Sequence, residues 1–213
     1  MIIKELHLTD LITIKYKQMK RLMDIFFSLI GLILLFPLFL IVGLIITIDS
    51  KGGVFYKQTR VGKGGKDFKL FKFRSMAVGS DKKGLLTVGG NDSRITKPGY
   101  FIRKYKIDEL PQLINVFIGD MSLVGPRPEV RKYVDLYNQE QQKVLSVQPG
   151  ITDYASIAYI NENEVLGKSD NPEKTYIEEV MPSKLKLNLK YIEEKSVITD
   201  IKIIFKTIAK IIN

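Results

Sequence analysis

The sequence predicts a mainly helical α+β fold with a membrane-inserted N-terminal helix, and three features lead to this prediction. An apolar run extends from Ile25 to Ile48, a β-hairpin is expected over 54–74, and an amphipathic segment over 200–212 closes the chain. We therefore expect two parts. Residues 1–50 form an N-terminal segment with a proline-broken, re-entrant membrane helix, and residues 51–213 form one cytoplasmic domain with a small β-hairpin and amphipathic interfacial helices.

Composition narrows the chemistry that the chain can perform. Its 213 residues suffice for one ordinary domain with a membrane segment, but hardly for two independent cores. The chain has no Cys and a single His, His7, which excludes disulfides and thiolate catalysis and argues against a serine triad or a His-rich metal site. The formal net charge of +10 indicates anionic partners such as lipid, nucleotide, pyrophosphate or nucleic acid. An ordinary basic, solvated surface is the alternative.

The apolar run has the length of a membrane segment. No charged residue occurs at the 24 positions between Asp24 and Asp49. A straight helix of this length reaches about 36 Å, enough to cross the hydrocarbon core. The run is too long for a signal peptide and no small-x-small cleavage site follows it, while a buried helix of a soluble domain would carry a polar face. These observations predict membrane insertion.

The path of this helix through the membrane has two solutions. Pro37 lies at its middle, where it removes a hydrogen bond and favours a bend. Because basic residues prefer the cytoplasmic side, a helix that enters, breaks at Pro37 and returns fits the basic flanks at both ends. A kinked transmembrane helix with its N-terminus outside is the alternative. The flanking basic residues are Lys15, Lys17, Lys20, Arg21, Lys51, Lys57, Arg60, Lys63 and Lys66.

A β-hairpin is predicted directly after the apolar run. Residues 54–61 and 68–74 are rich in β-formers, and the Gly/Lys-rich stretch 62–66 between them is a turn. That stretch lacks the spacing of a phosphate-binding Walker loop. Lys72 and Arg74 are two residues apart on a strand, so both project from one face. They form either a phosphate clamp or a solvated face.

Two adjacent carboxylates, Asp108 and Glu109, stand at a predicted helix start. A polar loop is expected over 77–99, followed by a helix over 100–106 and a second over 108–117, whose apolar residues repeat at helical spacing. We expect Asp108 to cap the second helix and Pro111 to lie in its first turn. The helix dipole would then favour the ionised form of Asp108.

The C-terminal third is predicted to be helical over 129–147 and 172–195, with a break at Pro149-Gly150. Over 200–212, isoleucine and phenylalanine side chains share one face while Lys202, Lys206 and Lys210 share another. This pattern is typical of a helix lying in a membrane interface, and packing into the domain core is the alternative.

Several short motifs together resemble the bacterial sugar transferases, the monotopic phosphoglycosyl transferases, in their minimal single-domain form. They occur in family order over most of the chain, from about Lys15 to Phe205. The motifs are Lys20-Arg21-Leu22-Met23-Asp24, Phe71-Lys72-Phe73-Arg74-Ser75-Met76, Arg103 with Asp108-Glu109-Leu110, Gly119-Asp120-Met121-Ser122, Val124-Gly125-Pro126-Arg127-Pro128 and Pro149-Gly150-Ile151-Thr152.

The resemblance implies transfer of a sugar 1-phosphate from a UDP-sugar to polyprenol (undecaprenyl) phosphate, with release of UMP. Asp108 would attack the sugar-bearing phosphorus and form a covalent intermediate, and Glu109 would assist it with Mg²⁺, for which both carboxylates are candidate ligands. Two displacements let one carboxylate serve both substrates in turn. We expect substrate phosphate or nucleotide contacts from Lys72, Arg74, Arg103, Pro126, Arg127 and Pro128.

The resemblance also implies the first membrane step of a surface glycan or glycoconjugate pathway, at the bacterial inner membrane, with the catalytic domain facing the cytoplasm. The lipid bilayer is an expected partner and nucleic acid is not, while a second copy of the chain and downstream glycosyltransferases are further candidates. A non-catalytic, membrane-anchored anion-binding protein and a lipid-phosphate enzyme without a covalent intermediate are the competing hypotheses. Residues 153–156, Asp-Tyr-Ala-Ser, depart from the family's common Gly-Trp-Ala-Gln.

Overall fold

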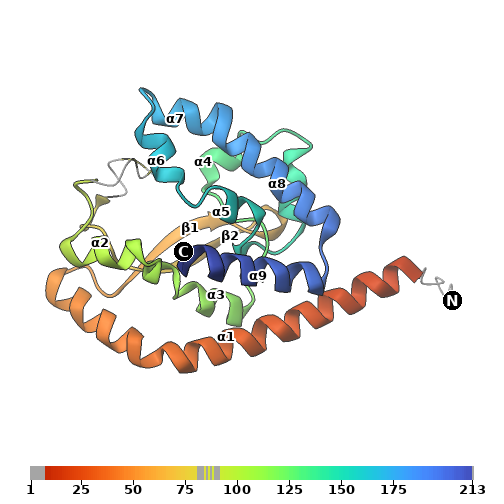
Figure 1. The fold of residues 1–213 in the computed structure, drawn as a ribbon, viewed down its shortest axis with the longest axis horizontal. Coiled ribbons are helices and arrows are strands. Elements are labelled where there is room, and N and C mark those ends of the chain that lie inside the picture. Colours follow the sequence, from red (N-terminus) through yellow and green to blue (C-terminus); the bar gives the residue numbers. More distant parts are fainter. Residues whose placement is uncertain (1–7, 81–83, 85, 87, 89–91, 213) are drawn as a thin grey trace.

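The computed structural model describes residues 8–80, 84, 86, 88 and 92–212 (Figure 1). His7 and part of the predicted loop over 77–99 lie outside these residues. The fold is mainly helical, with a two-stranded antiparallel hairpin and a short two-stranded parallel sheet. This confirms the predicted mainly helical α+β class and its small hairpin.

Helix α1 (Leu8–Asp49) is a single helix that continues through Pro37. It curves along one side of the domain, so that its C-terminal half turns toward α2 (Figure 1). A proline inside a helix removes one hydrogen bond and bends the axis, without ending the helix when its neighbours keep their bonds. Residues Ile14–Asp49 are long and apolar enough to cross a membrane. The re-entrant path remains a prediction.

Helix α1 also packs against the domain. Near its C-terminal end, Val42 and Ile46 are buried against Phe73 and Ile102. Near its middle, the buried carboxylate of Asp24 accepts hydrogen bonds from the Ser122 hydroxyl at 3.0 Å and the Leu123 N–H at 2.9 Å. Buried polar contacts of this kind fix position as well as burying area. The apolar helix α1 therefore packs against the domain at two places along its length.

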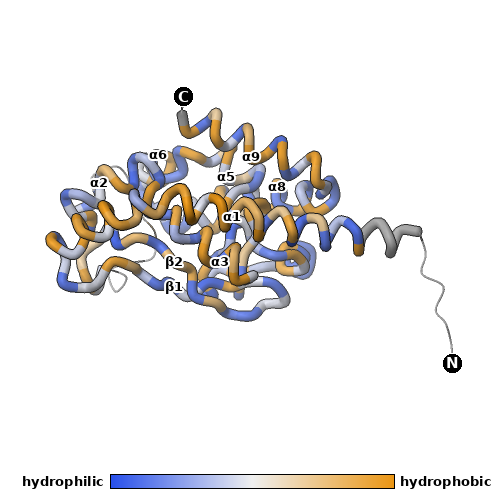
Figure 2. Tube along the Cα trace, turned by 90° about the horizontal axis from the view of Figure 1, so that it is seen from below, coloured by the Kyte–Doolittle hydropathy of each residue, from blue (hydrophilic) through white to orange (hydrophobic). Residues whose placement is uncertain are grey.

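An exposed apolar surface extends along α1 and the C-terminal helix α9 (Val197–Ile212) (Figure 2). On α9, Ile203 is buried in the core, whereas Ile201, Phe205 and Ile208 remain exposed. One side of this helix therefore packs into the core, as the alternative interpretation predicted. The other side presents apolar side chains, and its place in a membrane interface remains a prediction. A surface this apolar is typical of a membrane-contacting face. Its exposed residues on α1 include Phe26, Phe27, Ile30, Ile33, Leu34, Phe36, Leu40, Ile41, Leu44 and Ile48.

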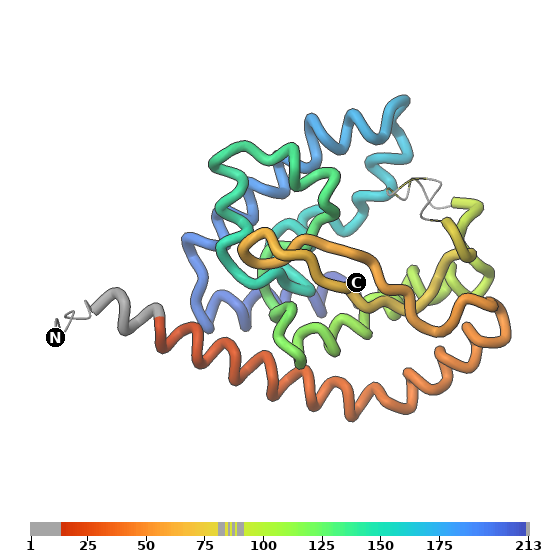
Figure 3. Tube along the Cα trace, turned by 180° about the vertical axis from the view of Figure 1, so that it is seen from behind, coloured from red at the N-terminus to blue at the C-terminus, as the bar shows by residue number. Residues whose placement is uncertain are grey.

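The predicted hairpin is confirmed. Strand β1 (Phe55–Val61) pairs antiparallel with β2 (Asp67–Phe73), with Phe55 opposite Phe73 and Val61 opposite Asp67. The turn η1 (Lys63–Gly65) contains Gly64 and Gly65 at positive φ, which glycine adopts without steric cost. Seen from behind, the hairpin crosses the middle of the domain (Figure 3).

The segment around the two carboxylates differs from the prediction. Helix α2 (Lys97–Lys104) begins three residues earlier than expected, because the Thr96 side chain caps it and Pro98 fits its first turn. Asp108 does not cap a helix; it lies in a separate turn of 3-10 helix, η3 (Ile107–Glu109). Helix α3 (Gln112–Ile118) starts only after Pro111. The predicted helix over 108–117 is therefore two elements.

The predicted helix over 129–147 is wrong. It contains only α4 (Arg131–Val134) and the 3-10 helix η4 (Gln141–Ser146). Between them, the Asn138 side chain accepts a hydrogen bond from the Gln141 N–H at 2.9 Å, a local bond that competes with a continuous helix. Two short strands, β3 (Ser122–Val124) and β4 (Gly150–Thr152), which the sequence did not predict, pair in parallel.

The remaining helices pack around a core of buried aliphatic and tyrosine side chains. The helical segment predicted over 172–195 is confirmed as α7 (Pro172–Thr175), the π-helical turn η5 (Tyr176–Val180) and α8 (Met181–Glu194). Two short helices precede it, α5 (Tyr154–Ala158) and α6 (Glu162–Gly167). The core consists of Val61, Val130, Tyr133, Val134, Tyr137, Val144, Leu166, Tyr176, Val180, Met181 and Leu185.

Candidate active site

Asp108 and Glu109 lie in a short turn that is aimed into a cavity. Lys106, just before them, has φ of 56°, in the left-handed region that few residues other than glycine adopt. This conformation ends the helical stretch that begins with α2 and allows η3 to direct the two carboxylates into the cavity. Asp108 is only 5% exposed, and both carboxylates line the cavity. Strained backbone of this kind clusters at functional sites.

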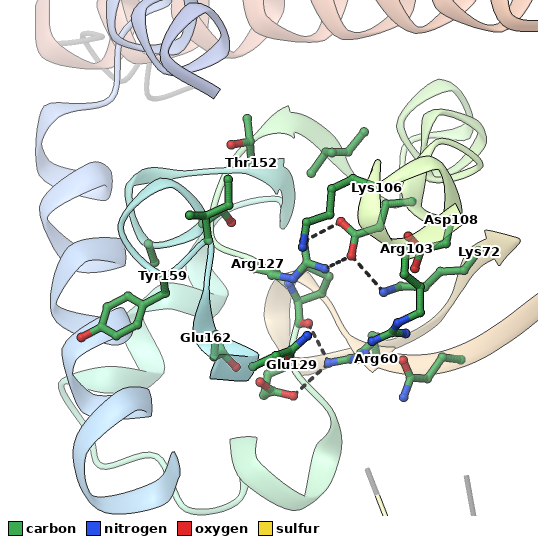
Figure 4. Close-up of a pocket in the computed structure, with 18 of the residues that line it drawn as sticks. Arg60, Lys72, Arg103, Lys106, Asp108, Arg127, Glu129, Thr152, Tyr159 and Glu162 are labelled. Carbon is green, nitrogen blue, oxygen red and sulfur yellow. Dashed lines mark hydrogen bonds and ion pairs between the residues drawn. The ribbon is translucent and has the colours of Figure 1, made fainter. Parts of the chain in front are cut away.

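Two cations from distant parts of the chain, Lys72 and Arg127, converge on Glu109. Figure 4 labels both cations where they line the cavity with Asp108. The Lys72 ammonium, on β2, lies 3.1 Å from Glu109 Oε1. The Arg127 guanidinium, from the loop after β3, is bidentate: its Nη1 donates to Oε2 at 3.1 Å and its Nη2 pairs with Oε1. A planar, bidentate guanidinium contact fixes both position and orientation. The structure thus brings together Lys72, Glu109 and Arg127, three of the predicted residues.

The two neighbouring acids have opposite pKa shifts. Burial raises the pKa of Asp108 above its usual range, and the nearby Lys72 opposes this shift without cancelling it. Burial also acts to raise the pKa of Glu109, but Arg127 and Lys72 outweigh it and hold that pKa well below its usual range. The helix-dipole stabilisation expected for Asp108 is therefore not the main influence. Neighbouring acids with separated pKa values can take different roles in one reaction.

The loop carrying Arg127 is held by close backbone approach. Gly125 N–H donates to the Thr152 carbonyl and Gly150 N–H to the Pro126 carbonyl, each at 3.0 Å. A side chain at Gly150 would have its Cβ only 2.1 Å from the Gly125 nitrogen. Only glycine permits this approach, which brings β4 against the loop.

The other residues predicted to contact the substrate are not part of the group around Glu109. Pro128 lines the main cavity, but Pro126 does not; it lies beside a much smaller hollow behind the loop. Arg103, on α2, lies beside Asp108 and acts to lower its pKa. Arg74 lines the cavity, yet its guanidinium donates to the carbonyls of Gly52 and Gly53, the former at close range. Arg74 thus also fastens the link between α1 and β1.

The cavity has a volume of about 1110 Å³ and a positive lining. Eight cationic side chains contribute to the lining, against four acidic ones. Such an excess favours an anionic ligand with more than one negative charge. The cations are Arg60, Lys72, Arg74, Arg94, Arg103, Lys106, Arg127 and Lys184, and the acids are Asp108, Glu109, Glu129 and Glu162.

Sequence reasoning missed part of this lining. Arg60, noted only as a membrane-flanking cation, pairs with Glu129 at 2.9 Å, and Lys184 pairs with Glu162 at 2.6 Å. Glu129 directly follows the Pro126-Arg127-Pro128 motif, and this position in the sequence could have identified it as a residue of the site. Lys184 lies in the long C-terminal helix with no local motif around it, and only the tertiary packing brings it to the cavity.

Within the described residues, no three side chains among His, Cys, Asp and Glu gather into a metal-binding cluster. Asp108 and Glu109 supply carboxylate oxygens, the ligand type that Mg²⁺ prefers. Mg²⁺ in nucleotide sites is commonly held by one or two carboxylates, with phosphates and water completing the shell. Asp108 and Glu109 can supply these one or two carboxylates, so the two acids fit a Mg²⁺ ion that is held mainly by the phosphates of a nucleotide.

Comparison with known proteins agrees with this geometry. The sequence profile described as bacterial sugar transferase matches residues 15–213, which include every site residue above. The chain belongs to the bacterial sugar transferase family. The matched residues cover the apolar helix α1, the hairpin and the cavity alike.

Three relatives of this sugar transferase illustrate its similarity. An Aeromonas hydrophila protein named UDP-N-acetylgalactosamine-undecaprenyl-phosphate N-acetylgalactosaminephosphotransferase is 39% identical over 92% of the chain and 44% of its own length. The Escherichia coli (strain K12) UDP-glucose:undecaprenyl-phosphate glucose-1-phosphate transferase is 40% identical over 91% of the chain and 40% of its own length. The chain therefore spans less than half the length of these two.

A third relative is similar in length. The Rhizobium leguminosarum bv. phaseoli exopolysaccharide production protein PSS is 38% identical over 89% of the chain and 93% of its own length.

Proposed function

We propose that this sugar transferase moves a sugar 1-phosphate from a UDP-sugar to polyprenol (undecaprenyl) phosphate and releases UMP. The observation that carries the proposal is the buried Asp108 beside the half-buried Glu109, in a cavity lined by twice as many cations as acids. A nucleoside diphosphate sugar supplies the negative charge that such a cavity favours. The names of the relatives support both the undecaprenyl phosphate acceptor and the sugar phosphate donor.

In the first step, an Asp108 carboxylate oxygen attacks the sugar-bearing phosphorus. A phosphorus–oxygen bond to Asp108 forms, the bond to the bridging oxygen of the diphosphate breaks, and UMP leaves with that bonding pair. Arg127, Arg103 and Lys72 are suited to neutralise the charge that grows on the phosphate oxygens. A buried, weakly solvated carboxylate is also a better nucleophile than a hydrated one.

In the second step, an oxygen of the polyprenol phosphate attacks the same phosphorus and displaces Asp108. Glu109, whose pKa is held low, remains ionised beside the reacting groups and is suited to direct Arg127 and Lys72 toward the phosphates. One wall of the cavity is apolar, with Phe27 of α1 and Phe205 and Ile208 of α9. That wall suits a lipid acceptor approaching from the apolar surface of these helices.

Mg²⁺ is part of the proposal. Bound by Asp108 and Glu109 together with substrate phosphates, it would offset phosphate charge during transfer. Binding would require Glu109 to share oxygens that now accept bonds from Lys72 and Arg127.

We further propose the bacterial inner membrane as the site of action, with the domain on the cytoplasmic face, and the first membrane step of a surface glycan as the role. Support comes from the long apolar helix α1 and from a relative named for exopolysaccharide production.

Release of UMP by the detergent-purified full chain tests the proposal. The protein is supplied with undecaprenyl phosphate, Mg²⁺ and a panel of UDP-sugars, with Asp108→Asn in parallel. We expect release with at least one sugar, lost by more than about a thousandfold in the variant and on chelation. Incubation with that donor alone should leave a phosphosugar adduct on the Asp108 peptide in mass spectrometry. Equal release by Asp108→Asn would remove the proposed nucleophile.

A further inference from the structure

The segment Pro126-Arg127-Pro128 has a single backbone N–H, that of Arg127, because proline has none. In the structure this N–H donates to the Asp153 carboxylate, with 3.3 Å between the nitrogen and Oδ2. The segment is also held by the two flanking hydrogen bonds at Gly125 and Pro126, and by Arg60, whose Nη1 donates to the Pro128 carbonyl at 3.2 Å. The Asp153 contact is therefore the one bond that the arginine's own N–H makes.

Asp153 is completely buried. Its second oxygen, Oδ1, accepts from the Ser156 N–H at 2.6 Å and so caps helix α5. Burial raises the pKa of this carboxyl, and the hydrogen bond that it accepts from the Ser156 N–H acts against the rise. An acid at this position costs free energy of desolvation, so a helix cap alone does not explain it: serine, threonine or asparagine caps a helix as well.

The two oxygens of Asp153 join two parts of the cavity. One holds the backbone at Arg127, whose guanidinium is bidentate on Glu109; the other holds the start of α5. A bidentate pair tolerates little displacement, since both hydrogen bonds weaken when the guanidinium turns. Displacing the Arg127 backbone would therefore loosen its contact with Glu109.

We infer that Asp153 is a positioning residue that sets Arg127 against Glu109 by accepting the only N–H of Pro126-Arg127-Pro128. It does not contact the reacting atoms; it acts through Arg127. Its consequence for turnover rests on the proposed function, whereas the hydrogen bond itself can be tested without any activity.

Hydrogen exchange tests the contact directly, because Arg127 contributes the only exchangeable amide of this tripeptide. The test variant is Asp153→Ser, which keeps a capping oxygen for the Ser156 N–H and lacks one for Arg127. We expect exchange at Arg127 to accelerate about tenfold or more, with Ser156 little changed. The matched control is Asn171→Ala, which removes the cap of α7, a bond of 3.1 Å to the Lys174 N–H. An unchanged Arg127 amide in Asp153→Ser would overturn the inference.

A double-mutant cycle on UMP release tests whether Asp153 acts through Arg127. We expect Asp153→Ser to lower kcat/KM about tenfold in the native background and less than about twofold beside Arg127→Gln. Equal losses in both backgrounds would overturn the inference. If the native chain releases no UMP, the proposed function fails and the exchange result alone decides the contact. Should Asp153→Ser not fold, Asp153→Asn, which offers one acceptor oxygen for two N–H donors, takes its place.

Discussion

Two clusters of charged side chains in this molecule contain similar residues but serve different purposes: one holds helices together, and the other lines the cavity. The first, called here the anchor cluster, consists of Tyr16, Lys20, Tyr191 and Asp200. Asp200 accepts hydrogen bonds from Lys20 at 2.6 Å, Tyr191 at 2.8 Å and Tyr16 at 3.2 Å. The second, the cavity cluster, consists of Lys72, Asp108, Glu109 and Arg127.

The clusters differ in what surrounds them. The anchor cluster pairs one lysine with one aspartate, satisfies that carboxylate with three donors and lines no part of the main cavity. The cavity cluster is coupled to further cations and opens onto a space of about 1110 Å³. Where a buried pair is neutral and saturated it holds elements together, here α1 to α8 and α9. Where such a cluster faces a cavity whose further cations leave an excess of positive charge, it can bind an anionic ligand.

The largest expected effect is loss of stability at the anchor cluster. Asp200→Ala leaves the largely buried Lys20 ammonium without its carboxylate partner, which we expect to cost about 3 kcal/mol of unfolding free energy. Thermal unfolding of the chain in detergent measures this. The double variant Lys20→Met with Asp200→Leu removes both charges and should recover most of the loss, because well-packed apolar residues can replace a buried pair. Failure of the double variant to recover would mean that the charges themselves are required.

A smaller effect is expected at the cavity cluster, on the pH profile. Lys72 is the strongest influence lowering the pKa of Asp108, which burial has raised. Lys72→Met should therefore raise this pKa further and move the acid limb of kcat/KM for UMP release to higher pH. We expect about a tenfold loss at neutral pH. Lys106→Gln is the matched control, since Lys106 acts on Asp108 more weakly, and its shift should be smaller. An unmoved acid limb in Lys72→Met would contradict the assignment.

The smallest expected effect is a gain in stability from Asp108→Asn. Because the folded-state pKa of Asp108 is raised, its charged form destabilises the fold at pH values above that pKa. Asparagine removes this cost, and we expect a rise of about 2–4 °C in melting temperature at pH 7.5. The gain should shrink as the pH falls toward about 3.9, the unfolded value, and vanish well below it, where Asp108 is protonated in both states. An equal gain at both pH values would point to packing instead.

Much of the fold could be predicted because it depends on local pattern. The apolar run predicts α1, and alternating β-formers around a Gly-rich turn predict the β1–β2 hairpin. The errors arise where tertiary packing decides. The segment 129–147 contributes buried side chains to the core without forming a continuous helix, and Pro111 delays α3 so that Asp108 is left in its own turn.

The motifs predicted which residues belong to the candidate site better than they predicted how those residues are arranged. Asp108, Glu109, Lys72 and Arg127 were named from motifs, and the structure brings them together. The motifs gave no indication that Arg74 would donate to Gly52 and Gly53, since the N–H donors of a guanidinium can bind a backbone carbonyl as well as a phosphate. The direction of the pKa shift at Asp108 was also beyond reach, because desolvation depends on what covers a side chain.

The sequence by itself determined the chemistry available to this protein: acids and cations, without cysteine and with one histidine, attached to an apolar helix. Only the tertiary structure decided which of these groups meet. Lys72, Glu109, Arg127 and Asp153 come from four separate segments. The close approach of Gly125 and Gly150 brings the Arg127 loop against the segment that carries Asp153. Charges interact over a few ångströms of space rather than along the chain, so their partners and their pKa values are properties of packing.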